Sequence, residues 1–385
     1  MDVAVIGGGI VGTATAAFLA EAGARVRLYE REALAAGASG RNSGVIQQPF
    51  DDVVVPLYEE TVGIYRRLQA ETGARIADLD APGGLLLVTR HEPFVFALAA
   101  RLGERYPHLR PTPLSADDLR REERAMADGV AGCRFEMGHP IVPSAPTYAF
   151  AGWADRLGVT IRLGRAAAPA VAGDRCTGVE VGGRVEPADA VVIAAGPWTP
   201  ALADPSGRWR PIEPRWGVVV ETLLANPPRL PMEEAELDEA LGTGEVGEVA
   251  RGEPASDGTA AGPGMGFSLI TAAGASAVGS TFLADEPHPP DWTERLLGRG
   301  ATFVPGIADA PIREVRACAR PVSADGRALV GAVPWTRNLF VAAGHGAWGI
   351  STGPASARQV ADLVLGRDPD IDPAFSPARF GLVAA

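Results

Sequence analysis

The feature that most constrains the fold is a glycine-rich turn between a short apolar strand and an Ala-rich helix. Residues 2–6 (DVAVI) are typical of a buried parallel strand, and residues 10–22 (IVGTATAAFLAEA) predict a helix closed by Gly23. A second strand is expected over residues 25–30. Strand, turn, helix and strand in this order predict a right-handed βαβ unit.

The turn has the spacing Gly7-x-Gly9-x-x-Gly12, and Glu30 ends the second strand. Gly7 permits a tight turn, Gly9 lets a pyrophosphate approach the backbone, and Gly12 lets the helix pack on the strand. The helix N-terminus offers free N–H groups to the phosphates. Glu30 is placed to accept hydrogen bonds from an adenosine ribose, which disfavours NADP. The turn therefore predicts a dinucleotide site, without separating NAD from FAD.

Charge and the basic residues exclude several classes of function. The formal net charge is −12, which argues against nucleic acid or an anionic membrane as a partner. All 35 basic residues are Arg, because the chain contains no Lys. A Lys Schiff base and a P-loop are therefore excluded.

Cysteine and histidine spacing indicates neither disulfides nor a metal site. Cys133, Cys176 and Cys318 are widely separated, and the five His form no H-x-x-H pair. A strand beginning at Asp2 would leave no room for a signal peptide, and no run of 18 apolar residues occurs. We therefore expect a cytoplasmic protein without a membrane span.

Composition divides the rest of the chain. A helix is expected over about residues 57–71, and strands separated by Pro-rich loops over 205–319. Residues 232–266 are rich in acidic residues, Gly, Ala and Ser, which predicts a mobile acidic insertion. A final strand at 340–343 precedes a glycine-rich turn and a helix.

Four further stretches resemble the D-amino-acid oxidase superfamily of flavoproteins, which includes glycine oxidase, sarcosine oxidase and D-amino-acid dehydrogenase. They are residues 39–46 (SGRNSGVI), residues 194–198 (AAGPW), Arg320-Pro321 followed by Asp325-Gly326-Arg327, and residues 344–349 (GHGAWG). The resemblance runs end to end, and it is weak over about 80–140 and 225–265. It implies an FAD-dependent enzyme that oxidises amino acids or amines.

The resemblance also implies an α/β fold in which a Rossmann-like FAD-binding domain is interleaved with an antiparallel-sheet substrate domain. The expected FAD-binding domain comprises residues 1–80, 141–204 and 320–385. The expected substrate domain comprises residues 81–140 and 205–319.

The cofactor site implied by the turn and the resemblance draws on segments throughout the chain. Its expected members are Gly7, Gly9, Ile10, Val11, Gly12, Glu30, Arg31, Ser39, Gly40, Arg41, Asn42, Ser43, Gly44, Val45, Val171, Ala195, Gly196, Trp198, Gly344, His345, Gly346, Gly349 and Ile350.

Arg320 is the expected substrate-binding residue, because in glycine oxidase and D-amino-acid oxidase the Arg of R-P binds the substrate carboxylate. A guanidinium forms a bidentate pair with a carboxylate and would fix the substrate Cα for hydride transfer to flavin N5. Trp348 stands where monomeric sarcosine oxidases have an oxygen-activating Lys, so oxygen reacts differently or another acceptor takes the electrons. Trp348 either forms a wall of the substrate cavity or packs in the core.

Cys318 leaves two alternatives open. In the sarcosine oxidase branch a Cys at this spacing from the D-G motif carries flavin covalently, so Cys318 is a candidate for a thioether to FAD. The other reading is a free Cys beside the cofactor.

Two other functions stay open. Residues 42–46 (NSGVI) also resemble L-2-hydroxyglutarate dehydrogenases, although Gln47 stands where that family has His. The substrate would then be a 2-hydroxy acid. The chain would alternatively be a flavin-binding subunit of a larger electron-transfer complex. A homo-oligomer or a partner subunit is compatible with either reading.

Overall fold

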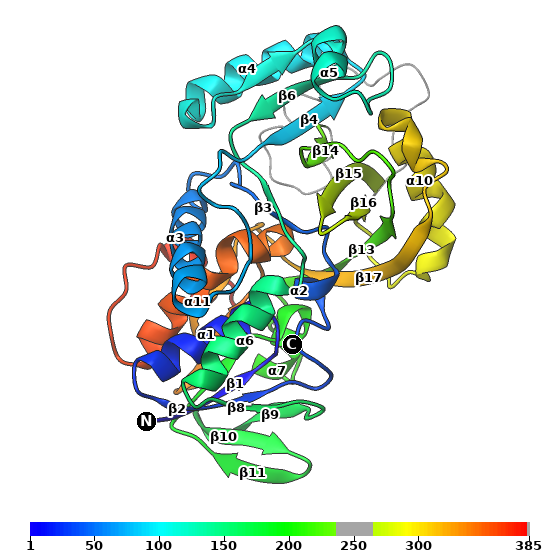
Figure 1. The fold of residues 1–385 in the computed structure, drawn as a ribbon. Helices are drawn as coiled ribbons and strands as arrows, with labels where there is room; N and C mark the ends of the chain where they lie inside the picture. Colours follow the sequence, from blue (N-terminus) through cyan, green and yellow to red (C-terminus); the bar gives the residue numbers. More distant parts are fainter. Residues whose placement is uncertain (236–264, 383–385) are drawn as a thin grey trace.

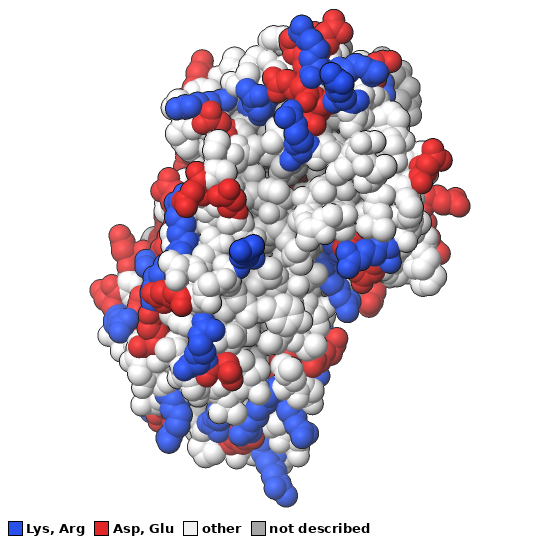
Figure 2. Space-filling view, in the orientation of Figure 1, with Lys and Arg blue, Asp and Glu red and all other residues white. Residues whose placement is uncertain are grey.

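The computed structural model describes residues 1–235 and 265–382 of the chain. Its lower half in Figure 1 contains a largely parallel sheet with helices against it, and its upper half contains a large, mostly antiparallel sheet. The α/β fold class expected from the sequence is confirmed. Figure 2 shows charged side chains of both signs interspersed towards the two ends of the same face, with a largely uncharged band between them.

The lower sheet is built on the predicted βαβ unit. The two strands of that unit pair in parallel, and so do the other neighbouring strands except for one antiparallel pair at an edge of the sheet. Its strands, in spatial order, are β18 (Leu329–Ala332), β19 (Leu339–Ala343), β12 (Ala190–Ile193), β1 (Asp2–Ile6), β2 (Arg25–Tyr29) and β8 (Thr160–Arg162).

Four helices bury one face of this sheet in a single apolar core, and a small antiparallel sheet covers the other face. The helices are α1 (Ile10–Glu21), α3 (Val55–Thr72), α6 (Ala145–Arg156) and α11 (Gly349–Val364). The small sheet contains β9 (Ala167–Ala172), β10 (Arg175–Val181) and β11 (Arg184–Pro187), and α7 (Thr199–Ala203) lies on the same side. Both faces are thus apolar, which explains the unbroken apolar runs of β1 and β12.

The upper sheet has eight strands, with one parallel pair between β14 and β4. In spatial order they are β17 (Ile312–Ser323), β13 (Ile212–Thr222), β16 (Ala275–Thr281), β15 (Met265–Ala272), β14 (Met232–Glu234), β4 (Leu85–Thr89), β6 (Ala131–Phe135) and β5 (Thr112–Leu114). Three helices lie against it: α4 (Glu92–Arg105), α5 (Ala116–Glu122) and α10 (Thr293–Phe303).

The remaining elements are short. They are α2 (Ala38–Arg41), the paired strands β3 (Val45–Ile46) and β7 (His139–Pro140), and the 3₁₀ turns η1 (Pro107–Leu109), η2 (Gly196–Trp198), η3 (Pro289–Trp292), η4 (Pro305–Ile307), η5 (Gly346–Trp348), η6 (Pro373–Phe375) and η7 (Pro377–Arg379).

Two sequence-based boundaries need correction. The expected acidic insertion begins at residue 232, but residues 232–234 form β14, an inner strand of the upper sheet with Met232 and Glu234 buried. The strand was not predicted because the acidic composition of this segment obscures the alternation of buried and less buried side chains over its three residues. Residues 236–264 of that expected insertion lie outside the described residues. β17 also continues across the expected boundary between residues 319 and 320, so Arg320 belongs to the upper sheet.

Candidate active site

A cavity of about 1000 Å³ lies where the two halves meet. It is lined by the glycine-rich turn and Glu30, and by residues of β17 and the turn before α11. A volume at the upper end of the range for ligand pockets suits a large cofactor together with a small substrate.

The glycine-rich turn has the geometry expected from its spacing. Gly7 has a φ of +119°, and a Cβ there would lie 2.3 Å from the Ala194 carbonyl oxygen. A Cβ on Gly12 would lie 1.9 Å from the Gly7 carbonyl oxygen, so only glycine lets α1 pack this closely on β1. Glu30 accepts hydrogen bonds from the Gly8 N–H at 2.6 Å and from the Glu32 N–H at 2.8 Å. Its carboxylate keeps lone pairs for a further donor.

The loop after β2 is held against this turn from both sides. The Ser39 hydroxyl accepts a hydrogen bond from the Ile10 N–H, the first of α1, at 2.9 Å. From the upper sheet, the buried Arg316 donates to the carbonyl oxygen of Asn42 at 3.2 Å and pairs with Glu221 at 2.6 Å. The loop therefore closes one side of the cavity in a fixed position.

The cavity lining includes an exposed aromatic ring. The Arg31 guanidinium stacks 4.0 Å from the ring centroid of Trp198, which is 41% exposed. Both residues line the cavity. A flat cation over an indole face is a surface on which an aromatic base can stack.

The turn before α11 brings a buried imidazole to the cavity. His345 is 4% exposed, and burial lowers its pKa to about 4, so the ring is neutral at pH 7. Its Nε2 has no hydrogen-bond partner among the described residues. α11 begins directly afterwards, at Gly349, and its first residues also line the cavity. A buried orphan nitrogen beside a helix N-terminus is a feature that a polar ligand would satisfy.

Arg320 also lines the cavity and is 8% exposed. Its guanidinium donates to the Thr281 carbonyl oxygen at 2.7 Å and to the Ser280 hydroxyl, and it lies 4.4 Å from the ring centroid of Phe282. A Cβ on Gly217 would lie 2.2 Å from the nearest guanidinium nitrogen, so this glycine makes room for the side chain. A guanidinium has five N–H donors, and the two used here leave enough for a bidentate carboxylate.

Cys318 lines the same cavity two residues before Arg320 on β17, and it is 3% exposed. Burial raises the pKa of the Cys318 thiol, against the opposing effect of the nearby Arg320, Arg316 and Arg41 guanidinium groups. Cys133, Cys176 and Cys318 are all free.

Most of the expected site residues line the cavity. They are Gly7, Gly9, Ile10, Val11, Glu30, Arg31, Ser39, Arg41, Asn42, Ala195, Gly196, Trp198, Cys318, Arg320, His345, Gly346, Gly349 and Ile350.

Eight expected residues do not line it. Four of them are glycines that shape its walls from behind, because a Cβ would strike a neighbouring chain segment. These four are Gly12, Gly40, Gly44 and Gly344. Ser43 and Val45 continue the loop beyond the lining.

The other two are placed elsewhere. Val171 is 48% exposed on β9, far along a strand whose first residue, Ala167, reaches the cavity. Trp348 is 9% exposed and is absent from the lining, which favours core packing over a place in the cavity wall.

Sequence reasoning missed part of the lining. Arg165 and Ala166 arrive on the connection from β8 to β9, and Trp216 arrives from β13; no motif marks them. Arg316 could have been predicted from the sequence, because Arg316, Cys318 and Arg320 stand at every second position of one strand and therefore point to the same face.

No helix within residues 1–235 and 265–382 is long and apolar enough to cross a membrane. The same residues contain no group of three or more His, Cys, Asp or Glu side chains arranged to hold a metal ion.

The chain matches known proteins along most of its length. The family described as FAD dependent oxidoreductase matches residues 2–363. A D-amino acid dehydrogenase of Cereibacter sphaeroides is 31% identical over 240 residues. That alignment covers 59% of this chain and 47% of the relative, so it spans about half the relative's length.

Solved structures share the fold over nearly the whole chain. Glycine oxidase of Geobacillus kaustophilus superposes with a TM-score of 0.80 at 24% identity and covers 98% of both chains. Glycine oxidase of Bacillus cereus gives a TM-score of 0.79 at 22% identity and covers 96% of both chains. Iminodiacetate oxidase of Chelativorans gives 0.77 at 20% identity, covering 97% of this chain and 98% of the other.

Proposed function

Because the chain belongs to the family of FAD-dependent oxidoreductases, we propose that it oxidises the Cα–N bond of an amino acid or an N-substituted glycine. The family predicted from four short motifs is thereby confirmed, and with it FAD as the cofactor. The named relatives include an amino-acid dehydrogenase, glycine oxidases and an iminodiacetate oxidase, and each of these names refers to a substrate with a carboxylate beside an amine.

The observation that carries the proposal is the buried Arg320 in the cavity wall. A buried guanidinium without a carboxylate partner is costly, and Arg320 has no ion pair among the described residues. Burial lowers its pKa, an effect that the Cys318 thiol and the Glu233 carboxyl oppose. A substrate carboxylate would supply the missing anion.

The cofactor would occupy the rest of the cavity. Residues that would hold it are the turn from Gly7 to Val11, Glu30, Arg31, Ser39, Arg41, Asn42, Ala195, Gly196, Trp198, His345, Gly346, Gly349 and Ile350. When bound, FAD supplies an acceptor for the hydride that leaves the substrate Cα.

The protein's own contribution is binding, orientation and exclusion of water. Arg320 would fix the carboxylate by two parallel hydrogen bonds and so hold the Cα in one position. Because Arg320, Cys318 and His345 are all buried, the reacting end of the cavity is shielded from solvent. A neutral His345 can donate or accept one hydrogen bond through its free ring nitrogen, so we assign it no proton transfer.

The proposal is tested by mixing the purified FAD-loaded protein anaerobically with a panel of D- and L-amino acids, N-substituted glycines and 2-hydroxy acids. Amino acids should bleach the flavin absorbance. The Arg320→Gln variant should lose this reaction with FAD still bound, whereas Arg313→Gln, an exposed Arg on the same strand, should behave as wild type.

Two results would overturn the proposal. Bleaching by hydroxy acids alone would favour the 2-hydroxy acid dehydrogenase. No bleaching by any compound would favour a flavin-binding subunit.

Repeating productive reactions with oxygen and with an artificial dye shows which acceptor takes the electrons, a question that the absence of Lys leaves open.

A further inference from the structure

A second charged residue, Glu233, lies outside the cavity lining, on the face of the upper sheet that also carries Arg316, Cys318 and Arg320. Met232 and Glu234 in β14 point to the other side: Met232 packs in the core below α10, and Glu234 pairs with Arg299 of α10. Because side chains alternate along a strand, Glu233 points to the opposite face. On that face it neighbours Ser268 of β15, its partner in the strand register.

The Glu233 carboxylate lacks a positive partner. Its one hydrogen bond within the described part of the chain comes from the Gln47 side-chain N–H, at 3.1 Å, and it forms no ion pair there. Burial raises the pKa of Glu233, and Gln47 and the Arg320 guanidinium act in the opposite direction. No hydrogen bond or ion pair joins Glu233 to Arg320 within the described residues.

Two polar atoms around Glu233 also lack partners. The Gln47 Oε1 and the Ser268 Oγ are buried without a hydrogen bond among the described residues, and their side chains are 5% and 3% exposed. Gly279 lies beside them, and a Cβ there would lie 3.0 Å from the Ser268 Oγ and 3.4 Å from the Ser43 Oγ. Native buried polar atoms are nearly all paired, so this cluster has the features of a built ligand site.

Arg320 and this cluster lie at different strands of the upper sheet. The Arg320 guanidinium bonds to β16, and β14 is two strands further across the sheet, with β15 between them. Two strand spacings put roughly 10 Å between the backbones of β16 and β14, from which the two groups are held. In an α-amino acid the amino nitrogen and the carboxylate lie within one residue's span, about 3.5 Å. A group that reaches Glu233 while Arg320 holds the carboxylate must therefore lie further along the substrate.

We propose that Glu233, with Gln47 and Ser268, binds a positively charged amino group remote from the substrate carboxylate. The preferred substrates then carry a carboxylate at one end and a second, cationic amine at the other. This inference rests on the proposed function, because it takes Arg320 as the site of the carboxylate. Glu233 determines specificity here and takes no part in the chemistry.

The test measures binding of unreactive ligands to the FAD-loaded protein, by the change in flavin absorbance under anaerobic conditions. Straight-chain ω-amino acids of three to six carbons are each compared with the fatty acid of equal length. At the best length, the ω-amino acid should bind the wild type at least about tenfold more tightly, as for a hydrogen bond to a charged group.

The Glu233→Gln variant should lose this preference and still bind the fatty acids as the wild type does. Glu213→Gln is the matched control, because Glu213 lies exposed on β13 beside Arg215, and it should keep the preference. Flavin content and melting temperature show whether each variant is folded.

Each outcome has a separate meaning. If the fatty acids bind in a manner that depends on Arg320 but the wild type shows no preference for the ω-amino acids, only the role of Glu233 is overturned. An undiminished preference in Glu233→Gln would do the same. Binding of fatty acids that is insensitive to Arg320→Gln, or no binding of either series, would overturn the carboxylate site and the proposed function with it.

Discussion

Arg320 can lie flat in the cavity wall because Gly217 on β13, the partner of Cys318 in the strand register, has no side chain. The guanidinium occupies the space where a Cβ would be, and its bonds to Thr281 and Ser280 hold it there. The motif R-P identifies the Arg, but nothing in the sequence near residue 320 points to a glycine about a hundred positions earlier. The antiparallel register of β13 and β17 brings the two together.

Gly217→Ala should therefore displace Arg320 and weaken the binding of a carboxylate ligand by about tenfold or more, the loss expected when a charge-assisted hydrogen-bond pair is misaligned. FAD content should be unchanged. Ligand titration of the variant measures this, with Gly103→Ala in α4 as the control because a Cβ there meets nothing within 4 Å. Unaltered ligand affinity in Gly217→Ala would contradict the described position of Arg320.

His345 makes a prediction about acid stability. Its pKa is about 4 when folded, against an ordinary value of 6.5, so between these values the unfolded chain binds more protons than the folded one. Stability should then be full above about pH 6.5 and fall as the pH drops towards 4, by at most about 1.4 kcal/mol per pH unit from this residue.

His345→Gln should flatten this part of the pH dependence, measured by urea unfolding at pH 4.5 and pH 7. His288→Gln should not, because His288 is largely exposed and paired with Asp291. Equal pH dependence in wild type and His345→Gln would show that His345 is not buried as a neutral ring.

Cys318 decides between the two readings of its place beside the cofactor. Burial raises the pKa of the thiol, which disfavours the reactive thiolate. We therefore expect acid denaturation to release all flavin into the supernatant, and Cys318→Ser to retain its FAD. Flavin that stays with the precipitated wild type, but not with Cys318→Ser, would instead establish a covalent bond.

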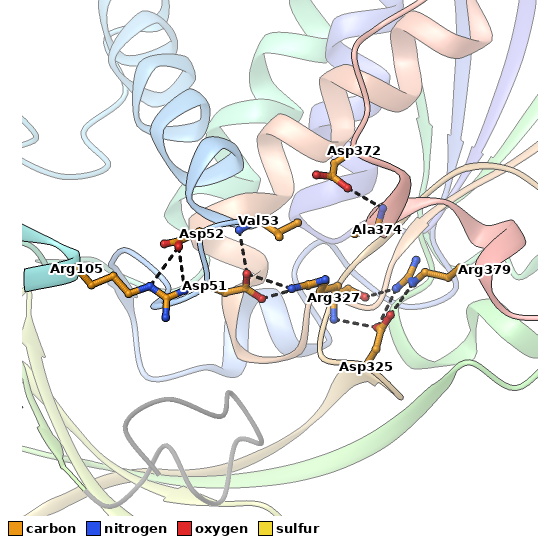
Figure 3. Close-up of polar contacts among 9 residues, drawn as sticks. All are labelled: Asp51, Asp52, Val53, Arg105, Asp325, Arg327, Asp372, Ala374 and Arg379. Carbon is orange, nitrogen blue, oxygen red and sulfur yellow. Dashed lines mark hydrogen bonds and ion pairs between the residues drawn. The ribbon is translucent and has the colours of Figure 1, made fainter. Parts of the chain in front are cut away.

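At the scale of elements, the segment carrying Gln47 to the site is fixed by ion pairs (Figure 3). The Asp51 carboxylate, next to the start of α3, accepts hydrogen bonds from the Arg327 Nε at 3.2 Å and from the Val53 N–H at 2.9 Å. Asp52 pairs with Arg105 of α4 at 2.9 Å. The D-G-R stretch, recognised only as a family motif, thus has a structural role: Arg327 holds this segment.

In the same stretch, Asp325 pairs with Arg379 near the C-terminus at 2.6 Å, and Arg379 also donates to the Arg327 carbonyl oxygen at 2.8 Å (Figure 3). One short turn therefore connects the segment before α3, the edge of the lower sheet and the C-terminal region.

A double-mutant cycle of Asp51→Asn and Arg327→Gln should give a coupling energy of about 0.5–1 kcal/mol, the upper range for partly exposed pairs. The pair Asp174 and Arg337 is about twice as exposed, and its cycle should give a coupling close to zero. Urea unfolding of the wild type, the four single variants and the two double variants measures both. Equal couplings would contradict the anchoring role of Arg327.

The elements predicted correctly from the sequence are those in which the local sequence pattern and the tertiary packing require the same structure. The βαβ unit is correct because its glycines, apolar strand and helix all require the same packing, and α3 extends the expected helix by only a few residues. β14 was missed because a three-residue strand has too few positions to show an alternation, and its two Glu side chains resemble a surface segment. Glu233 was accordingly hidden inside an expected insertion.

At the scale of the molecule, the cavity exists because chain segments far apart in sequence meet between two sheets. Glu30, Trp198, Arg320 and His345 come from four different parts of the chain. Motifs with a backbone requirement could be found one by one. The residues that only complete the wall, such as Arg165 and Trp216, depend on how the sheets cross, which no local pattern encodes.

A crystal structure of the FAD complex with an unreactive amino-acid analogue is the most direct test of the proposed carboxylate site. We expect FAD along the cavity from Glu30 to the turn before α11, and the analogue's carboxylate within about 2.7–2.9 Å of two Arg320 nitrogens. A carboxylate bound away from Arg320, with that guanidinium still bonded only to Thr281 and Ser280, would contradict it.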